Sequence, residues 1–428
     1  MRPFGRPLAA SLILCALIVV VSAATGSARP RVRMRGFDAT IQSHARSMLD
    51  EGRETFRFDT FGDEDFWGGQ LHLHEAVAQA KPRDALGLGL KVDSDALSAP
   101  TRHSIARGAV DLDDPAVTRE LLRRDAVVGV KGFFDDEGNL TSIGITCALC
   151  HSTVDDAIVP GVGRRLDGWA NRDLDVGKIV NLSPTVAPLA TVLGVDEPAV
   201  RSVLTSWGPG KFDAALILDR KSGPTLIPPA YGLAGVNLHT WTGWGSVTHW
   251  NAFVAVLEMH GKGTFFDPRL SDAAQFPVAA QNGFGDVRSS PDLVTPKLAA
   301  LHVYQLDIPA PAPPLGSFNA GAAARGDALF SGKAGCARCH VEPLYTEPGW
   351  NMHTPAEIGI EATQADRAPD KRYRTSPLKG LWAHGKGGFY HDGRFPTLRA
   401  VVDHYDAVFT LGLTDAEKSD LVEYLKSL

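Results

Sequence analysis

The alternation of apolar and polar positions is clearest near the end of the chain. Thr414-Asp-Ala-Glu417 has the pattern of a capping box, in which the two outer side chains satisfy free backbone N–H groups at a helix start. The leucines at 421, 425 and 428 follow at helical spacing and would form one apolar face. Upstream, the alanine-rich stretch Asn319–Phe330 predicts a second helix that leads into a cysteine-containing loop. Between these helices, residues 373–405 carry several glycines and prolines, which predicts loop with one helix from about Thr397.

The first two thirds of the chain show weaker periodicity. Helical patterns occur around 41–54, 198–207 and 251–259, whereas 208–245 is rich in glycine, proline and aromatic residues and predicts long loops. No long alternating run is present, so any strands are expected to be short. The predicted fold class is mainly α with much irregular structure.

The extreme N-terminus resembles an export leader. Arg2 and Arg6 precede an apolar run over 8–21, and Val21-Ser22-Ala23 offers a small-x-small cleavage site. We expect a signal peptide over 1–24 and a periplasmic or secreted protein, with no membrane span after leader removal. The alternative is a retained membrane anchor, although the run is shorter than the roughly 20 residues that a spanning helix needs.

A proline-dense segment divides the rest of the chain. Leu306-Asp-Ile-Pro-Ala-Pro-Ala-Pro-Pro-Leu315 is typical of an extended, semi-rigid connector. It predicts an N-terminal domain over 30–305, a linker over 306–317 and a C-terminal domain over 318–428. The formal net charge of −6 and the absence of a lysine or arginine block argue against nucleic acid as a partner.

Four of the five cysteines fall in two identical patterns. These are Cys147-Ala-Leu-Cys150-His151 and Cys336-Ala-Arg-Cys339-His340. C-x-x-C-H is the attachment signature of c-type haem: two thiols add to the two vinyl groups, and the adjacent histidine supplies the proximal nitrogen to iron. A redox dithiol needs no following histidine, and a zinc site would need four ligands close together. Two copies in an exported chain therefore predict two covalently bound haem c groups.

Around the second motif the sequence resembles a known family. The residues concerned are Gly326-Asp-Ala-Leu329-Phe330, the run from Tyr373 to Leu381, Phe389-Tyr390-His391-Asp392-Gly393 and Asp403-His404-Tyr405. Together they resemble the bacterial di-haem cytochrome c peroxidase superfamily, which includes the enzyme that matures methylamine dehydrogenase and the haem-dependent rubber oxygenases. The stretches 56–63 and 207–213 are closer to the rubber-oxygenase branch. The resemblance implies two cytochrome c-like haem domains with long loops, the N-terminal one enlarged.

This chain departs from the family peroxidases at one ligand position. Those proteins carry methionine immediately before His-Asp-Gly as the axial ligand of the electron-transfer haem, whereas this chain has Tyr390, as in the methylamine-dehydrogenase-maturing branch. The candidate sixth ligands of the second haem are Tyr390, His391, His353 and Met352. A phenolate would lower the haem potential and a thioether would raise it.

The first haem has a different set of candidates. Its sixth position could be filled by His239, His249, Met259 or His260, or stay open. Three tryptophans, at 241, 244 and 250, could pack on the porphyrin or stand over an open iron. Three arginines, at 164, 165 and 172, could pair with its propionates or be solvated surface charges.

Three functions fit the sequence. The protein could be a redox enzyme of the di-haem peroxidase type, an electron-transfer cytochrome, or an oxygenase that activates dioxygen. The size of the N-terminal part favours an enzyme, because a simple carrier needs only about 100 residues per haem. The expected partners are a small redox protein that donates or accepts electrons and, for the enzyme, peroxide or dioxygen.

Overall fold

The computed structural model describes residues 36–428, and the expected signal peptide lies outside them. The chain divides into two units, Met1–Arg46 and Ser47–Leu428. The boundary falls inside the first helix, α1 (Phe37–Phe58), whose N-terminal part is all that is described of the first unit. This helix contains the predicted helix over 41–54. Everything below concerns the second unit.

Helices dominate the second unit, so the mainly α expectation is confirmed. Before the first cysteine motif they are α2 (Leu73–Gln79), α3 (Pro82–Gly87), α4 (Ala99–Ala106) and α5 (Pro115–Arg123). From that motif to the proline-rich segment they are α6 (Ala148–His151), α7 (Val176–Asn181), α8 (Ala187–Leu193), α9 (Glu197–Trp207), α10 (Leu216–Asp219), α11 (Val247–Phe253), α12 (Pro277–Asn282) and α13 (Leu298–Asp307). After it come α14 (Ala320–Ser331), α15 (Thr363–Asp366), α16 (Leu398–Phe409) and α17 (Asp415–Ser427).

The strands are short, as expected, and pair two by two. Parallel β1 (Val92–Asp93) pairs with β5 (Val162–Gly163). The antiparallel pairs are β2 (Val130–Phe134) with β3 (Leu140–Ile145), β4 (Ser152–Val154) with β6 (Arg165–Asp167), β7 (Lys211–Phe212) with β8 (Thr225–Leu226), and β9 (Thr264–Phe266) with β10 (Asp286–Arg288). The predicted loop over 208–245 therefore contains only the short elements β7, α10 and β8.

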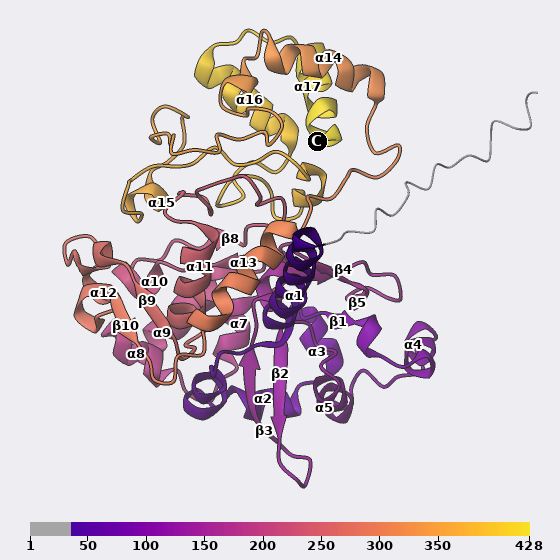
Figure 1. The fold of residues 1–428 in the computed structure, drawn as a ribbon, viewed down its shortest axis with the longest axis vertical. Helices are drawn as coiled ribbons and strands as arrows, with labels where there is room; N and C mark the ends of the chain where they lie inside the picture. The colour runs from indigo at the N-terminus through magenta and orange to yellow at the C-terminus, as the bar shows by residue number, and fades with distance from the viewer. Residues whose placement is uncertain (1–35) are drawn as a thin grey trace, which may run out of the picture. The chain divides into compact units, whose positions relative to one another are not determined.

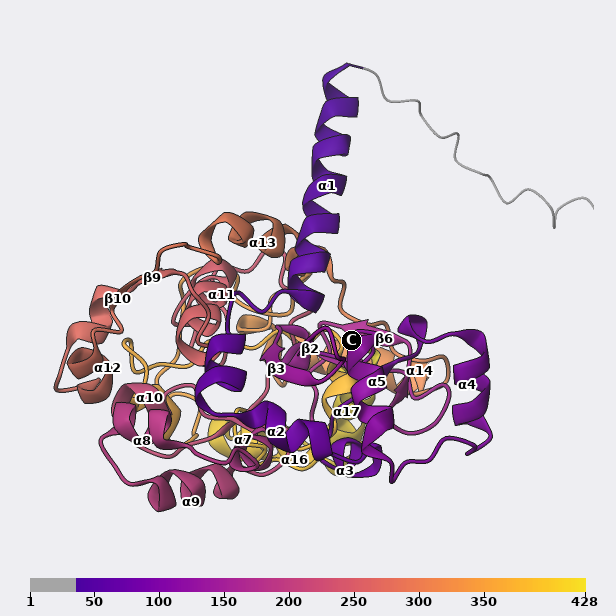
Figure 2. The same cartoon turned by 90° about the horizontal axis from the view of Figure 1, so that it is seen from below.

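Helix α9 illustrates how local sequence sets these elements. Asp196 is its N-cap and accepts a hydrogen bond from the Ala199 N–H, and a proline occupies the first turn. Val200, Leu204 and Trp207 then recur at helical spacing and are all buried. Figures 1 and 2 show α9 beside α8, with α10 and α12 nearby.

The C-terminal helices form a separate apolar cluster. Figure 1 shows α14, α16 and α17 grouped together in orange to yellow. Their buried contacts include Phe330, Val402, Leu421 and Leu425. Helices α14 and α17 approach so closely that a Cβ atom on Gly326 would lie 2.2 Å from the Asp420 carbonyl oxygen. The glycine of the Gly-Asp-Ala-Leu-Phe run is thus required by this crossing.

The predicted C-terminal helices are confirmed. The capping box is formed, with the Thr414 side chain accepting from the Glu417 N–H and the Glu417 carboxylate accepting from the Thr414 N–H. Thr397 is the N-cap of α16. The proline-rich segment begins where α13 ends, and no helix or strand occurs in it before α14. The domain boundaries at 306 and 317 stay predictions.

The expected helix over 251–259 differs in one respect. The α-helical part, α11, begins earlier at Val247 and continues as a π-helical turn over Val254–Glu258. The turn closes with the Met259 N–H donating to the Val254 carbonyl, one residue farther back than in an α-helix.

Among the described residues, no helix combines the length and apolar character needed to cross a membrane.

Candidate functional site

The first cysteine motif lies directly after β3, on the short helix α6. The His151 ring places Nδ1 3.1 Å from the Pro228 carbonyl oxygen. Burial lowers the pKa of His151 to about 4, so the ring is neutral at physiological pH. A neutral imidazole whose Nδ1–H donates to a backbone carbonyl presents Nε2 as a free ligand, which is the usual arrangement behind a metal-bound histidine.

The chemical state of the first two cysteines fits the same interpretation. Cys147 and Cys150 are free thiols, and burial raises the pKa of each to about 12. A redox-active dithiol needs a lowered thiol pKa, because the thiolate is the reactive form. These two side chains are therefore poor redox thiols and well placed for thioether bonds to a buried group.

A cavity of about 280 Å³ surrounds the first motif. Both cysteines and His151 line it, and its walls are mainly apolar. Of the candidate sixth ligands, His239 and Met259 line this cavity, whereas His249 and His260 do not. The donor set and the apolar enclosure fit a haem at this motif.

The two histidines outside the cavity make other contacts. His249 Nε2 lies 3.7 Å from an Asp267 carboxylate oxygen. The His260 ring stacks on Phe66 with ring centroids 3.5 Å apart. Inside the cavity wall, His239 Nε2 lies 3.0 Å from the Val236 carbonyl oxygen, while its Nδ1 is buried without a partner in the described chain.

The three tryptophans are fixed in different ways. Trp241 donates from Nε1 to the Leu226 carbonyl at 3.0 Å. Trp244 donates to the Asp267 carboxylate at 3.0 Å and belongs to the main apolar core. The Trp250 indole N–H is buried with no partner in the described part of the chain. All three line the cavity, so both interpretations of these residues stay open.

Glu258 was not singled out in the sequence analysis. It ends the π-helical turn and lines the cavity, with Oε1 buried and unpartnered in the part of the chain that the structure describes. Burial, with a smaller contribution from Asp213, raises the pKa of Glu258 well above its usual range. Burial therefore favours the protonated, neutral form of this carboxyl. A lone acidic residue within the otherwise apolar run 252–259 was the available signal.

The three arginines after the first motif differ in their exposure and in their hydrogen-bond partners. Arg164 is exposed and pairs with Asp155 at 3.0 Å, and Arg165 pairs with Asp93 at 3.0 Å. Two of these arginines have buried N–H donors without a partner among the described residues, Arg165 on Nη1 and Arg172 on Nε and Nη1. Burial lowers the pKa of Arg172 to about 10. Both arginines therefore retain donors for an anionic group such as a propionate, although Arg165 is already paired with Asp93.

A further buried arginine comes from the C-terminal part of the chain. Arg374 lines the cavity of the first motif and donates to the Leu238 and Thr240 carbonyls. Burial lowers its pKa to about 10. No sequence pattern connects this residue with the first motif, because the two are more than 200 positions apart.

The second motif repeats the histidine arrangement of the first. His340 places Nδ1 3.0 Å from the Tyr345 carbonyl oxygen, and burial lowers its pKa. Burial likewise raises the pKa of Cys336 to about 11. Phe330, from the end of α14, lies against the His340 ring with centroids 6.4 Å apart. Both motifs therefore hold a neutral imidazole with Nε2 free.

Tyr390 is the sixth-ligand candidate whose polar atom is free. It adopts a left-handed backbone conformation at φ +69°, which only a constrained site imposes on a bulky residue. Its hydroxyl is buried without a hydrogen-bond partner of good geometry in the described chain. Burial raises its pKa far above the ordinary value, and the Tyr405 phenol adds to this. Cys336 and Cys339 contribute to the raised pKa of Tyr405, so this pair of phenols lies near the second motif.

The two histidine candidates already form hydrogen bonds with carboxylates. His391 Nε2 lies 2.6 Å from a Glu361 carboxylate oxygen and its ring stacks on Tyr373. His353 Nε2 lies 2.6 Å from Glu347, and these two form a cluster with Cys339. A ring nitrogen held by a carboxylate must break that bond before it can bind iron, so neither geometry favours ligation.

Met352 points toward the N-terminal part of the chain. Its Sδ atom lies 2.6 Å from the position that a Cβ atom on Gly243 would occupy. Gly243 belongs to the loop that also carries Trp241, so the structure brings Met352 toward the first cavity. None of the four sixth-ligand predictions is tested by these contacts.

The chain is similar to two curated proteins. It is 27% identical over 245 residues to the methylamine utilization protein MauG of Methylorubrum extorquens, covering 48% of this chain and 64% of that protein. It is 26% identical over 224 residues to the cytochrome-c peroxidase IdrP1 of Denitromonas iodatirespirans, covering 40% of this chain and 58% of that protein. These similarities confirm the predicted resemblance to the di-haem cytochrome c peroxidase and MauG superfamily and, at that level, support the predicted oxidoreductase.

The match to both superfamily members is partial. The aligned region spans less than two thirds of either relative. No family model matches the chain. Among solved structures, a hydrazine synthase of Kuenenia stuttgartiensis aligns with TM-score 0.29 and 19% identity, covering 48% of this chain and 73% of that one. A MauG-like protein associated with microbial copper homeostasis aligns with TM-score 0.31 and 17% identity, covering 49% and 76%. We draw nothing from likenesses at these scores.

Proposed function

We propose that this protein is an exported, periplasmic di-haem c-type cytochrome that acts as a redox enzyme of the peroxidase type. Peroxide would react at the first motif, and the second motif would receive electrons from a small redox protein. The observation that carries this proposal is the buried, unpartnered Glu258 carboxyl in the cavity that contains His151.

The residues of the two motifs would hold two covalent haems. Cys147 and Cys150 would form the thioether bonds of the first and Cys336 and Cys339 those of the second, with His151 and His340 as proximal ligands. When bound, haem supplies an iron that can accept a peroxide oxygen and pass single electrons. The Pro228 and Tyr345 carbonyls fix the two imidazoles in the tautomer that this role requires.

Glu258 would act on protons in the first cavity. Cleavage of an O–O bond needs a proton delivered to the departing oxygen and removed from the other. A carboxyl that is kept neutral by burial can donate at neutral pH, and its free oxygen can accept a proton in return. A pure electron carrier has no use for such a group, and its burial costs stability.

The second motif offers a contrasting environment. Tyr390 supplies a phenol rather than a second acid, and we propose it as the sixth ligand of the second haem. A phenolate ligand would favour the oxidised iron and lower the potential. Tyr405 lies beside it, and its neutral phenol O–H could donate a hydrogen bond to such a phenolate, while the proton that ligation releases would pass to solvent.

The test is the rate at which the holoprotein consumes hydrogen peroxide with a reduced small cytochrome as donor. Glu258→Gln should lower kcat by about 10²–10⁴-fold while both haems stay attached. Glu54→Gln, at an exposed position on α1, is the matched control and should leave the rate unchanged. A Glu258→Gln enzyme as active as the wild type, or a wild type without peroxide turnover, would leave the electron-transfer cytochrome or the oxygenase as the function.

A further inference from the structure

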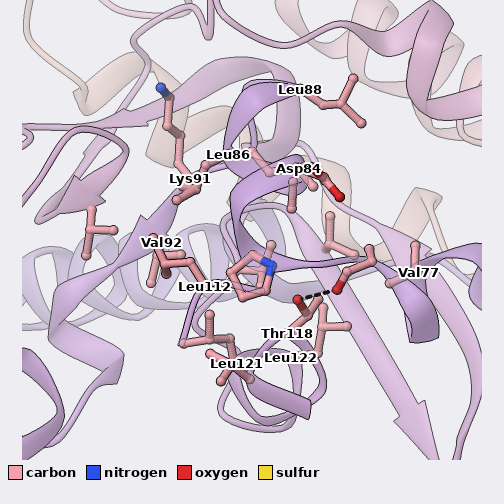
Figure 3. Close-up of a pocket in the computed structure, with 18 of the residues that line it drawn as sticks. Val77, Asp84, Leu86, Leu88, Lys91, Val92, Leu112, Thr118, Leu121 and Leu122 are labelled. Atoms are coloured by element: carbon pink, nitrogen blue, oxygen red, sulfur yellow. Dashed lines mark hydrogen bonds between the residues drawn. The ribbon is translucent and has the colours of Figure 1, made fainter. Parts of the chain in front are cut away.

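A second, larger cavity lies in the N-terminal part of the second unit. It has a volume of about 1120 Å³ and is enclosed by α2, α3, α4 and α5 together with β2 and β3. In Figure 3, Leu86, Leu88 and Val92 face Leu112, Leu121 and Leu122 across its interior. Ligand pockets in proteins usually measure about 300–1,000 Å³, so this cavity is large enough for a sizeable organic molecule.

The few polar groups of this cavity are already satisfied. The Thr118 hydroxyl donates to the Ala80 carbonyl at 2.7 Å, drawn as a dashed line in Figure 3. The Lys91 ammonium points away from the apolar side chains and pairs with Asp173 at 2.8 Å. The remaining interior surface is almost entirely aliphatic. With no free donor or charge inside it, the cavity offers nothing to compensate the desolvation of a charged ligand.

Apart from the buried, paired Lys91, the charged lining groups lie nearer the surface. Asp84 and Arg124 are exposed, and Arg124 donates to Glu120 at 2.7 Å. An uncharged ligand could therefore enter without breaking a buried ion pair.

Helix α4 shows that the cavity is part of the fold rather than a packing fault at one residue. It is a capped helix, with Ser98 as N-cap, yet none of its residues is fully buried. Its apolar side chains Ile105 and Ala106 line the cavity, and Ile105 also packs against a small buried cluster that includes Val92 and Leu97. Helix α4 therefore forms one wall of the cavity.

This cavity is separate from the one around the first motif but adjoins it. Of the first motif, only Leu149 lines the large cavity, and the cysteines and His151 do not. Ile145 and Leu149 line both cavities, so they form the partition between them.

We propose that the large cavity is a binding site for a neutral, largely hydrocarbon small molecule, such as a medium- or long-chain alcohol or another uncharged aliphatic compound. The size, the aliphatic lining and the satisfied polar groups select this class. The ligand would rest against the partition formed by Ile145 and Leu149. The proposal does not depend on peroxidase activity.

Isothermal titration calorimetry of the holoprotein with 1-decanol tests this site. We expect one molecule bound per chain, and decanoate, with the same chain and a charged head, to bind at least about tenfold more weakly. Ile105→Trp on α4 and Ala76→Phe on α2 place bulk in the cavity from two different helices. Each should weaken decanol binding by at least about tenfold. His103→Trp, at an exposed position on α4, is the matched control and should bind decanol like the wild type.

A second titration separates the two cavities. Saturating cyanide occupies the iron of the first haem, and decanol affinity should be the same with and without it. Competition by cyanide would place decanol in the haem cavity and overturn the proposal. No binding of decanol by the wild type, decanoate binding as tightly as decanol, or affinity unchanged in both filling variants would also overturn it. Peroxide turnover measured on the same samples shows independently whether the proposed function holds.

Discussion

Arg367 offers the most direct test of what joins the C-terminal part of the chain to the wall of the first cavity. Its guanidinium bonds Asp219 at 2.8 and 3.0 Å and Asp213 at 3.0 Å. It also donates to the carbonyls of Lys221 and Gly223. All three charged side chains are at most 3% exposed. We therefore consider Arg367→Met, which keeps the bulk and removes the charge.

The magnitude follows from what the substitution leaves behind. Two carboxyls would stay buried without a cation, and removal of one partner of a buried ion pair costs about 3–5 kcal/mol. Burial already raises the pKa of Asp213 although Arg367 opposes it. Without the arginine this pKa rises further, so the folded state binds more protons than the unfolded state. The loss in stability should then grow as the pH rises above the carboxyl's unfolded pKa of about 4.

Guanidinium unfolding of the holoprotein, followed by far-ultraviolet circular dichroism at pH 5 and pH 8, measures both effects. Arg372→Met is the control, because that arginine is about half exposed and should contribute little. Adding Asp213→Asn and Asp219→Asn to Arg367→Met should recover much of the stability. A loss below about 1 kcal/mol, or a loss that shrinks with rising pH, would refute the reasoning.

Three further outcomes follow from single side chains. Tyr390→Phe should turn the second haem high-spin and raise its potential, and an unchanged electron paramagnetic resonance spectrum would exclude the phenol as ligand. Burial lowers the pKa of His384 to about 3, so the unfolded state binds more protons than the folded state between about pH 3 and 6.5. The substitution His384→Phe removes this difference. The fall in unfolding free energy on acidification, measured by urea unfolding, should then be less steep by up to about 1.4 kcal/mol per pH unit. Thr414→Ala should lower the unfolding free energy by about 1 kcal/mol through loss of the cap, whereas Ser419→Ala on the same exposed face of α17 should change it by less than about 0.5 kcal/mol.

The C-terminal part of the fold was accessible from sequence because its signals are local. A capping box and an N-cap threonine each act within a few residues, and the structure contains both. The C-x-x-C-H motifs are equally local, since the covalent chemistry fixes the spacing.

The residues that line the two cavities could not be predicted from local sequence signals. Arg374 reaches the first cavity from the far side of the proline-rich segment, and no pattern near position 374 records that contact. Glu258 was overlooked because a single acid in an apolar helix reads as a solvent-facing position, whereas the π-helical turn accompanies its burial. The large cavity depends on how α2, α3, α4 and α5 are arranged in space, and residue periodicity says nothing about that arrangement.

The two motifs hold their histidines in the same way, but the other side chains around each motif differ. In each, a backbone carbonyl holds Nδ1 of a buried, neutral histidine. Beyond this common part, the first cavity contains an acid kept neutral by burial, and the second motif has a pair of phenols nearby. A carrier gains nothing from unlike surroundings on its two haems beyond a difference in potential. An enzyme that must move protons at one iron and electrons at the other needs a proton donor at only one of them, and in the proposed function Glu258 would provide it at the first.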